Sequence, residues 1–123
     1  MLPHFTVLIF GFRNPSMNHT EYKNHYETIH IPLAKSYART TWPLSHTRHY
    51  FDRNGPFGAA SPKVDWDSMA VLTFGNASHA GAFQAALGTD AAHNAILTDE
   101  HIFMRPDSPQ QVIIGTDTVI TLP

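Results

Sequence analysis

Strand-like and helix-like segments alternate along the chain in an order that few folds accommodate. The strand-like segments cover residues 5–13, 46–51, 66–74 and 110–122. The helix-like segments begin near Asn18 and near Asn76. The resulting β-α-β-β-α-β order is the ferredoxin-like arrangement of an α+β protein, with helices on one face of the sheet only. The bare face needs a partner, and packing against the sheet of a second copy meets that need.

The size and charge of the chain exclude several classes of protein. Its 123 residues are enough for one core, so we expect residues 1–123 to form a single domain. A formal net charge of −2 gives little attraction for nucleic acid. The apolar runs are only strand-sized and the start lacks signal-peptide features, so we expect no membrane association and a cytoplasmic location. The absence of cysteine excludes disulfides, thiolate nucleophiles and Cys-ligated metals.

The first helix has a clear start and one apolar face. Asn18 predicts the N-cap, and Glu21 three residues later completes a capping-box pattern. One face then carries Tyr22, Tyr26, Ile29 and Leu33. On a regular helix His25 and His30 flank this face on opposite sides, so they are not expected to share a metal ion.

Pro32 makes His30 the unusual residue of this helix. A proline lacks the backbone N–H and disfavours helical geometry at the residue before it, so we expect the helix to end or kink at His30. The imidazole then lies beside free carbonyl groups, where its pKa can be tuned across neutral pH. A purely structural capping histidine, followed by a structural proline, explains the same pattern.

The other histidines give weaker signals. His46 and His49 alternate on a strand, so one enters the interior and the other faces solvent. His93 and His101 lie in residues 90–104, which we expect to be partly helical and irregular. By contrast, residues 76–88 predict a regular helix with an Asn cap and a Gly stop.

Two segments carry a resemblance to a known family. These are EYKNHYETIHIPLAK, in which Tyr22, Tyr26 and His30 precede a Pro-Leu pair, and TDEHIFMRPD near the last strand. Together with the order of elements, they resemble the EthD-type branch of the dimeric α+β barrel superfamily. The resemblance implies a homodimer with its sheets face to face, and a pocket between the sheet and helices of each protomer.

The resemblance also implies a range of activities. Related fungal proteins are cofactor-free decarboxylases, dehydratases and cyclases of polyketide pathways. In plant polyketide cyclases of the same barrel, a His after the second helix works with a pocket Tyr, and AAHNAI around His93 is similar to that segment. Other barrel members are cofactor-free oxygenases that act on anthrones, and some degrade haem.

We therefore predict a lyase or cyclase that acts on an aromatic or polyketide β-keto compound without a cofactor or metal. His30 is the expected acid/base and Tyr26 the hydrogen-bond donor, with His93 or His101 closing the pocket. The expected substrate-binding residues are Tyr22, His49, Phe10 and Phe83. The sequence leaves open whether Arg13, Arg48 or Lys35 binds a carboxylate. The alternatives are a cofactor-free oxygenase, a haem-binding protein and a non-catalytic small-molecule-binding barrel.

Overall fold

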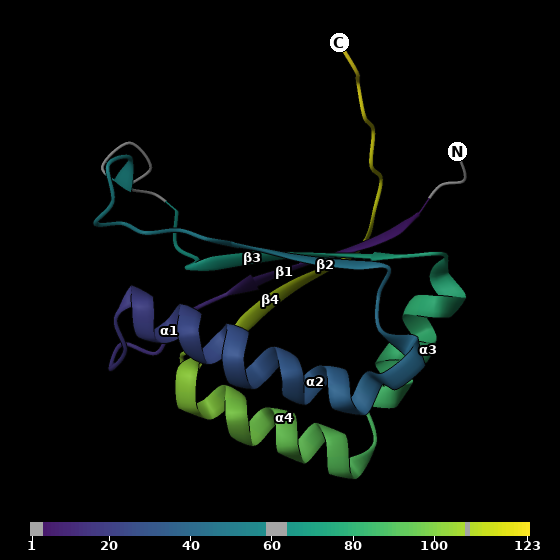
Figure 1. Ribbon diagram of the computed structural model, residues 1–123, viewed down its shortest axis with the longest axis horizontal. Helices are drawn as coiled ribbons and strands as arrows, with labels where there is room; N and C mark the ends of the chain where they lie inside the picture. The colour runs from purple at the N-terminus through teal and green to yellow at the C-terminus, as the bar shows by residue number, and fades with distance from the viewer. Residues whose placement is uncertain (1–3, 59–63, 108) are drawn as a thin grey trace.

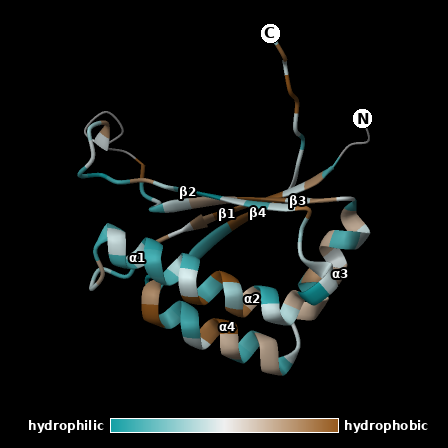
Figure 2. Cartoon of the chain, in the orientation of Figure 1, coloured by the Kyte–Doolittle hydropathy of each residue, from teal (hydrophilic) through white to brown (hydrophobic). Residues whose placement is uncertain are grey.

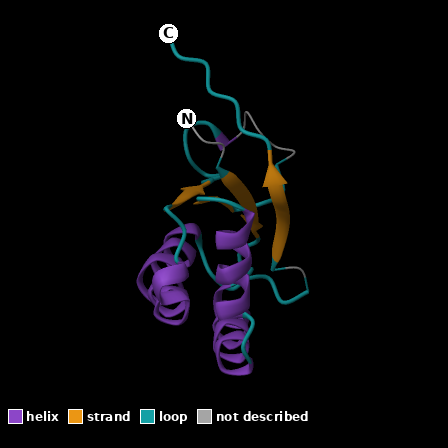
Figure 3. Cartoon of the chain, turned by 90° about the vertical axis from the view of Figure 1, so that its right-hand side faces the viewer, coloured by secondary structure: helices purple, strands orange, loops and turns teal. Residues whose placement is uncertain are grey.

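The computed structural model of the protein describes residues 4–58, 64–107 and 109–123. They form two layers, a sheet and a set of helices that cover one of its faces (Figure 1). The side view separates the layers clearly (Figure 3). The strands are β1 (Phe5–Gly11), β2 (Ser45–Tyr50), β3 (Ser68–Phe74) and β4 (Gln110–Thr116). The helices are α1 (His19–His25), α2 (Ile31–Ala38), α3 (Ala77–Leu87) and α4 (Asp90–Phe103).

The sheet has the strand order β2-β3-β1-β4, and every neighbouring pair is antiparallel. This order confirms the ferredoxin-like α+β fold and puts β1 at a central position of the sheet. Successive residues of a strand face opposite sides, and in β3 the set from Ser68 to Phe74 alternates between buried and half-buried. The buried residues face the helices. The strand register therefore separates a helix-facing side from a bare side of the sheet.

The bare side is defined by residues that pair across the strands. Leu8 pairs with both Val71 and Ile113, and Met69 pairs with both Phe10 and His49. These six residues therefore share one face. The helices of Figure 1 and Figure 3 lie on the other face.

The first helix starts as the sequence predicts. The Asn18 side chain accepts a hydrogen bond from the Glu21 backbone N–H at 2.8 Å, and the Glu21 carboxylate accepts from the Asn18 backbone N–H at 3.0 Å. This reciprocal pair is a complete capping box. The second predicted helix is confirmed as α3, with Asn76 at its N-cap and Gly88 at its C-cap.

We expected the helix to end or kink at His30, and the expected end is wrong. A π-helical turn (Tyr26–His30) joins α1 to α2, and the helical path continues to Ala38. The Ile31 backbone N–H reaches the carbonyl of Tyr26, five residues back. Pro32 cannot supply an N–H to the carbonyl of Thr28, and the wider π turn carries the chain past this missing bond. The proline consequently shifts the helix register instead of ending the helix.

The irregular structure expected for residues 90–104 is also wrong, because Asp90–Phe103 form the regular helix α4. The Thr89 hydroxyl caps this helix by accepting from the Ala92 backbone N–H. The buried residues of α4 are Ala92, Asp99 and Phe103. This stripe lies against the continuous helical path formed by α1, the π turn and α2, which we call the first helical segment. Phe103 packs there with Tyr22 and Tyr26.

The C-terminal segment after β4 is extended. It leaves the sheet and runs away from the helices (Figure 1), and its apolar side chains Val119, Ile120 and Leu122 are exposed. The hydropathy view shows the same segment as an apolar extension (Figure 2). Within the part of the chain that the structure describes, no helix is both long and apolar enough to cross a membrane.

Candidate functional site

One buried carboxylate joins two histidines of the first helical segment. The Nε2 atom of His25 lies 2.7 Å from Asp99 Oδ1, and the Nδ1 atom of His30 lies 2.9 Å from Asp99 Oδ2. An ionised carboxylate can only accept hydrogen bonds, so both ring nitrogens carry a hydrogen and donate to it. This arrangement leaves the lone pair of neutral His30 on Nε2.

The π turn is the reason that two histidines five residues apart reach the same carboxylate. In a regular α-helix their side chains point in different directions, which is why the sequence placed them on opposite sides. The turn Tyr26–His30 adds the residue that brings His25 and His30 to the side facing α4. The expectation that they flank the apolar face on opposite sides is therefore wrong.

His30 and Tyr26 line a cavity of about 120 Å³ between the sheet and the helices. Its lining residues are Ile9, Tyr26, His30, Ile31, Ala34, Trp42, His46, Leu72, Phe83, Leu87, Ile96, Glu100 and Gln110. We call this space the inner cavity. The first helical segment, β2, α3 and α4 all contribute to it, so its shape depends on both layers.

The polar atoms on this lining are available to a ligand. Among the described residues, neither His30 Nε2 nor the Tyr26 hydroxyl makes a hydrogen bond within the protein, although His30 is 6 % and Tyr26 3 % exposed. No fully buried side-chain nitrogen or oxygen of the described residues lacks a partner. Both atoms must therefore reach accessible space, and the inner cavity is the space these residues line.

The chemistry of His30 is set by two opposing effects. Burial lowers the pKa of His30 below its ordinary value, whereas the hydrogen bond and charge of Asp99 act in the opposite direction. Asp99 also fixes the ring, since it holds Nδ1 at 2.9 Å. At neutral pH His30 is thus an oriented, neutral imidazole with its basic nitrogen toward the cavity.

His46 contributes the opposite hydrogen-bonding group. Burial, reinforced by the Arg48 charge, lowers the pKa of His46 to about 4, so the ring is neutral at pH 7. Arg48 Nη1 donates to His46 Nδ1 at 2.9 Å, which leaves the ring hydrogen on Nε2. The ring stacks on Trp42 at a centroid distance of 5.3 Å. His46 is therefore a neutral hydrogen-bond donor on the cavity wall.

Glu100 is the acidic residue on the lining. Burial, together with the charge of neighbouring Asp99, raises the pKa of Glu100 to about 7. A substantial fraction of this carboxyl group is protonated at neutral pH. The inner cavity thus combines a base, two hydrogen-bond donors and a titrating acid within mostly apolar walls.

A larger apolar hollow adjoins the inner cavity. It has a volume of about 370 Å³ and shares Ile9, Leu72, Phe83 and Leu87 with the inner cavity. We call it the outer pocket. Val112 and Ile114 of β4 form another part of its wall. A ligand can therefore place a polar group beside His30 and an apolar body in the outer pocket.

The structure brings some of the sequence-predicted residues together and separates others. His30, Tyr26 and Phe83 line the inner cavity, and His93 lines the outer pocket. His101 is exposed on α4. The remaining residues lie away from both spaces.

Those residues are Tyr22, His49 and Phe10. Tyr22 is buried, and its hydroxyl is bonded to Ser68 Oγ at 2.8 Å. His49 and Phe10 lie on the bare side of the sheet, opposite His30, and Phe10 packs on Trp66 at a centroid distance of 5.7 Å.

Sequence reasoning missed Asp99, Glu100 and His46. Asp99 and Glu100 belong to an i, i+4, i+7, i+8, i+11 stripe of α4 that begins at Ala92 and ends at Phe103. Two acids on an otherwise apolar stripe indicate a functional site. The stripe can be recognised once Thr89 is identified as the N-cap of the helix. The alternation of β2 does predict that one of His46 and His49 is interior, and the structure shows that it is His46.

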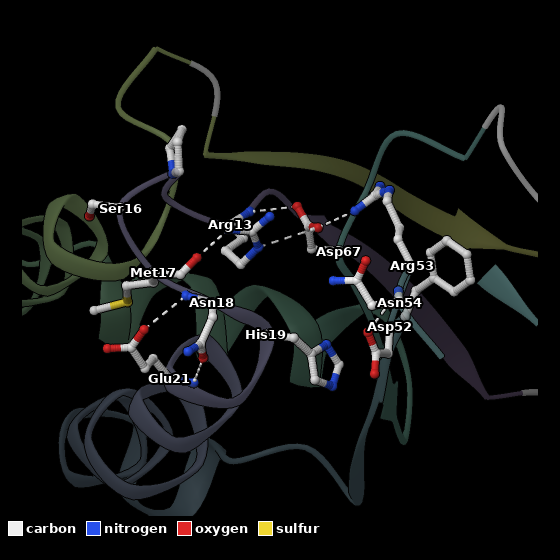
Figure 4. Close-up of a pocket in the computed structure, with 12 residues that line it drawn as sticks. Arg13, Ser16, Met17, Asn18, His19, Glu21, Asp52, Arg53, Asn54 and Asp67 are labelled. Atoms are coloured by element: carbon white, nitrogen blue, oxygen red, sulfur yellow. Dashed lines mark hydrogen bonds and ion pairs between the residues drawn. The ribbon is translucent and has the colours of Figure 1, made fainter. Parts of the chain in front are cut away.

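A separate polar hollow of about 460 Å³ lies near the start of α1. Figure 4 shows the side chains of Arg13 and Arg53 directed toward Asp67. Asp67 accepts from the Arg13 backbone N–H at 2.8 Å and forms an ion pair with Arg53. The Arg13 guanidinium also donates to the Met17 carbonyl. These pairings hold β3 to the loops around α1, and we assign them a structural role.

A metal site is not formed by the described parts of the chain, since no group of three or more His, Asp or Glu side chains there is arranged to hold an ion. His25, Asp99 and His30 instead satisfy one another through hydrogen bonds.

Comparisons with known proteins agree with this architecture. Residues 14–107 match the EthD domain family. The fold is similar to a crystal structure of an EthD family protein from Bacillus halodurans, with a TM-score of 0.58 and 18 % sequence identity. That similarity covers 93 % of this chain and 99 % of the bacterial one. No curated protein matches the sequence.

Proposed function

Because the chain belongs to the EthD domain family, a branch of the dimeric α+β barrel superfamily, we propose that it is an enzyme that transfers protons on an aromatic or polyketide-type carbonyl compound. The reaction is that of a lyase or cyclase, with His30 as the general base. The observation that carries this proposal is the orientation of His30, which gives Nδ1 to Asp99 and leaves Nε2 to the inner cavity.

The first step is removal of a proton from the carbon next to a carbonyl group. His30 Nε2 accepts the proton, and the C–H electron pair forms the enolate. The new imidazolium keeps its Nδ1–H bond to Asp99, whose negative charge stabilises it. A positioned base of this kind contributes about 10²–10⁴-fold to the rate.

The second requirement is a place for the negative charge on the enolate oxygen. The His46 Nε2–H and the Tyr26 hydroxyl are donors on the same cavity lining. Burial raises the pKa of Tyr26 well above its ordinary value, so its hydroxyl keeps its hydrogen and donates it. Preorganised donors in a site with little water stabilise a developing oxyanion strongly.

Glu100 completes the cycle as the acid. In its protonated form it donates to a departing hydroxyl group, which leaves as water, or to the oxygen formed on ring closure. His30 then holds the substrate proton, and exchange with solvent returns both groups to their starting states. The part that the protein plays in each step is a proton transfer, while the C–O bond breaks or the ring bond forms within the substrate.

The test is turnover of a panel of aryl ketones and polyketide-type β-dicarbonyl compounds, followed by mass spectrometry without oxygen. We expect wild-type protein to release water or form a ring, and His30→Gln to lose this activity by at least about 10²-fold. His4→Gln, an exposed histidine near the N-terminus, is the matched control and retains it.

Two other outcomes would change the assignment. Product that forms only when air is admitted would identify an oxygenase that uses the same base to generate a carbanion. Absence of turnover under both conditions, with His30→Gln only less stable, would contradict an enzymatic role and leave a binding barrel.

A further inference from the structure

We propose that the inner cavity selects an uncharged aryl ketone or phenol and rejects the corresponding carboxylate. This inference rests on the proposed function and specifies the substrate class for the same site. It also distinguishes decarboxylation at this site from dehydration and cyclisation. Decarboxylation requires a free carboxylate on the substrate, whereas dehydration and cyclisation do not.

The charged residues on the lining point to this selection. Among the described residues that line the inner cavity and the outer pocket, there is no lysine or arginine, and Glu100 is an acid. Asp99 adds a second negative group behind His30. A ligand carboxylate beside His30 would therefore enter an apolar space with two acids and no lysine or arginine, and burial of an unpaired charge is strongly unfavourable.

The three basic residues that the sequence offers as carboxylate-binding candidates, Arg13, Arg48 and Lys35, do not line either space. Arg48 contacts His46 but is paired with Glu27, with 3.0 Å between Arg48 Nη2 and Glu27 Oε1. Arg13 lies in the separate polar hollow beside Asp67. Lys35 is exposed, and its ammonium group lies over the Trp42 ring, 5.8 Å from the centroid, outside the lining.

The two cavity histidines do not replace a basic residue. His46 accepts a hydrogen bond from Arg48 on Nδ1, so it presents a neutral N–H. His30 could meet a carboxylate only as an imidazolium, and the charge of that imidazolium is already balanced by Asp99. A bound carboxylate would add a further negative charge beside Asp99 and Glu100, with no lysine or arginine among the described lining residues to balance it.

The walls fit a flat, neutral body. Trp42 and Phe83 both line the inner cavity, with ring centroids 6.0 Å apart. Phe83 continues into the outer pocket, where the other walls are largely aliphatic. The ketone or phenol oxygen then reaches the donors on Tyr26 and His46, while the ring system lies along the apolar walls.

A matched pair of ligands tests the proposal by binding alone. The pair is 2-acetyl-6-hydroxynaphthalene and 6-hydroxy-2-naphthoic acid, which have nearly the same shape and differ by one negative charge. Calorimetry at pH 8, where Glu100 is ionised, is expected to give a Kd at least tenfold lower for the ketone. The His30 ring signals in NMR spectra are expected to shift on addition of the ketone, which places it in the inner cavity.

Two variants identify the origin of the discrimination. Glu100→Gln is expected to reduce the ratio of the two Kd values several-fold by removing one negative charge from the lining. Asp90→Asn removes a charge from an exposed position on the same helix and leaves the ratio unchanged. Equal or tighter binding of the acid, or binding of neither ligand, would overturn the proposal.

These binding results are independent of turnover. Selective binding of the ketone without turnover of any panel compound would contradict the proposed function while supporting the charge selection. Turnover that depends on His30, combined with tighter binding of the acid, would support the proposed function and contradict the charge selection.

Discussion

Several titratable groups lie close to His30. Asp99 and Glu100 lie on α4, His46 lies on β2, and His25 lies one π turn earlier. A positive charge on His25 lowers the pKa of His30, while Asp99 raises it. The net effect of burial and neighbours is a depressed pKa, so His30 is a base at neutral pH.

These shifts predict a bell-shaped pH profile for kcat/KM. The pKa of His30 lies below the ordinary 6.5, so activity rises as His30 loses its proton below that pH. Glu100 must hold a proton to act as the acid, so activity falls as pH rises through about 7. Glu100→Gln is expected to remove the falling limb and lower the maximum by roughly 10²-fold. Initial rates from pH 5 to 9 with a substrate from the panel measure both limbs. A falling limb that persists in Glu100→Gln would show that another group is the acid.

The elements that build the site are the π turn and α4. The π turn directs His25 and His30 to one side, and α4 supplies the carboxylate between them. Phe103 on α4 stacks against the His25 ring at a centroid distance of 4.7 Å. The contact between these elements thus combines aromatic packing with two charge-assisted hydrogen bonds.

Replacement of Asp99 tests how strongly this carboxylate holds the two elements together. Asp99→Ala leaves two ring N–H groups without their acceptor in a buried setting, and we expect it to lower the free energy of unfolding by roughly 2–5 kcal/mol. Asn94→Ala, at an exposed position of the same helix, is expected to change it by less than about 0.5 kcal/mol. Urea denaturation at pH 7 measures both. Equal effects of the two substitutions would contradict the structural role of Asp99.

Element types were predictable where a local signal was complete. The capping box at Asn18, the Asn76 cap and the apolar run of β1 each specify their element from a few neighbouring residues. The π turn was not predictable, because Pro32 indicates only that regular bonding fails. Whether the chain then ends, kinks or widens depends on packing against α4, which lies far away in the sequence.

The sequence predicted the residues of the first helix that line the inner cavity, but not the residues from other elements that contact them. His30 and Tyr26 stand out within one helix, and both line the inner cavity. Asp99 lies 69 residues from His30 in the sequence, so their contact follows only from the topology. His49 and His46 differ by the face of β2 that they occupy, and only the strand register decides between them.

At the scale of the whole molecule, the bare side of the sheet is an apolar face that no helix of the described residues covers. Leu8, Val71, Met69, Phe10 and Ile113 share this face. An apolar face of this kind is typical of an interface between subunits. The homodimer expected from the sequence therefore stays a prediction, with the bare side as its interface.

Sedimentation velocity at micromolar concentration tests this prediction. We expect wild-type protein to sediment as a dimer, and Val71→Lys to sediment as a monomer because a charge then lies in the middle of the apolar face. Asn24→Lys adds the same charge at an exposed position of α1 and is expected to leave the dimer intact. A monomeric wild-type protein would contradict the dimer. A dimeric Val71→Lys variant would place the interface elsewhere.

The proposed role of His30 is to remove a proton from carbon inside the cavity, whatever bond is broken afterwards. The most direct measurement is incorporation of deuterium from D₂O into the α-carbon of 2-acetyl-6-hydroxynaphthalene, followed by NMR. Wild-type protein and His4→Gln are expected to accelerate exchange, whereas exchange with His30→Gln is expected to fall to the rate in buffer. Equal acceleration by wild type and His30→Gln, or none by wild type, would contradict the assignment of His30 as the base.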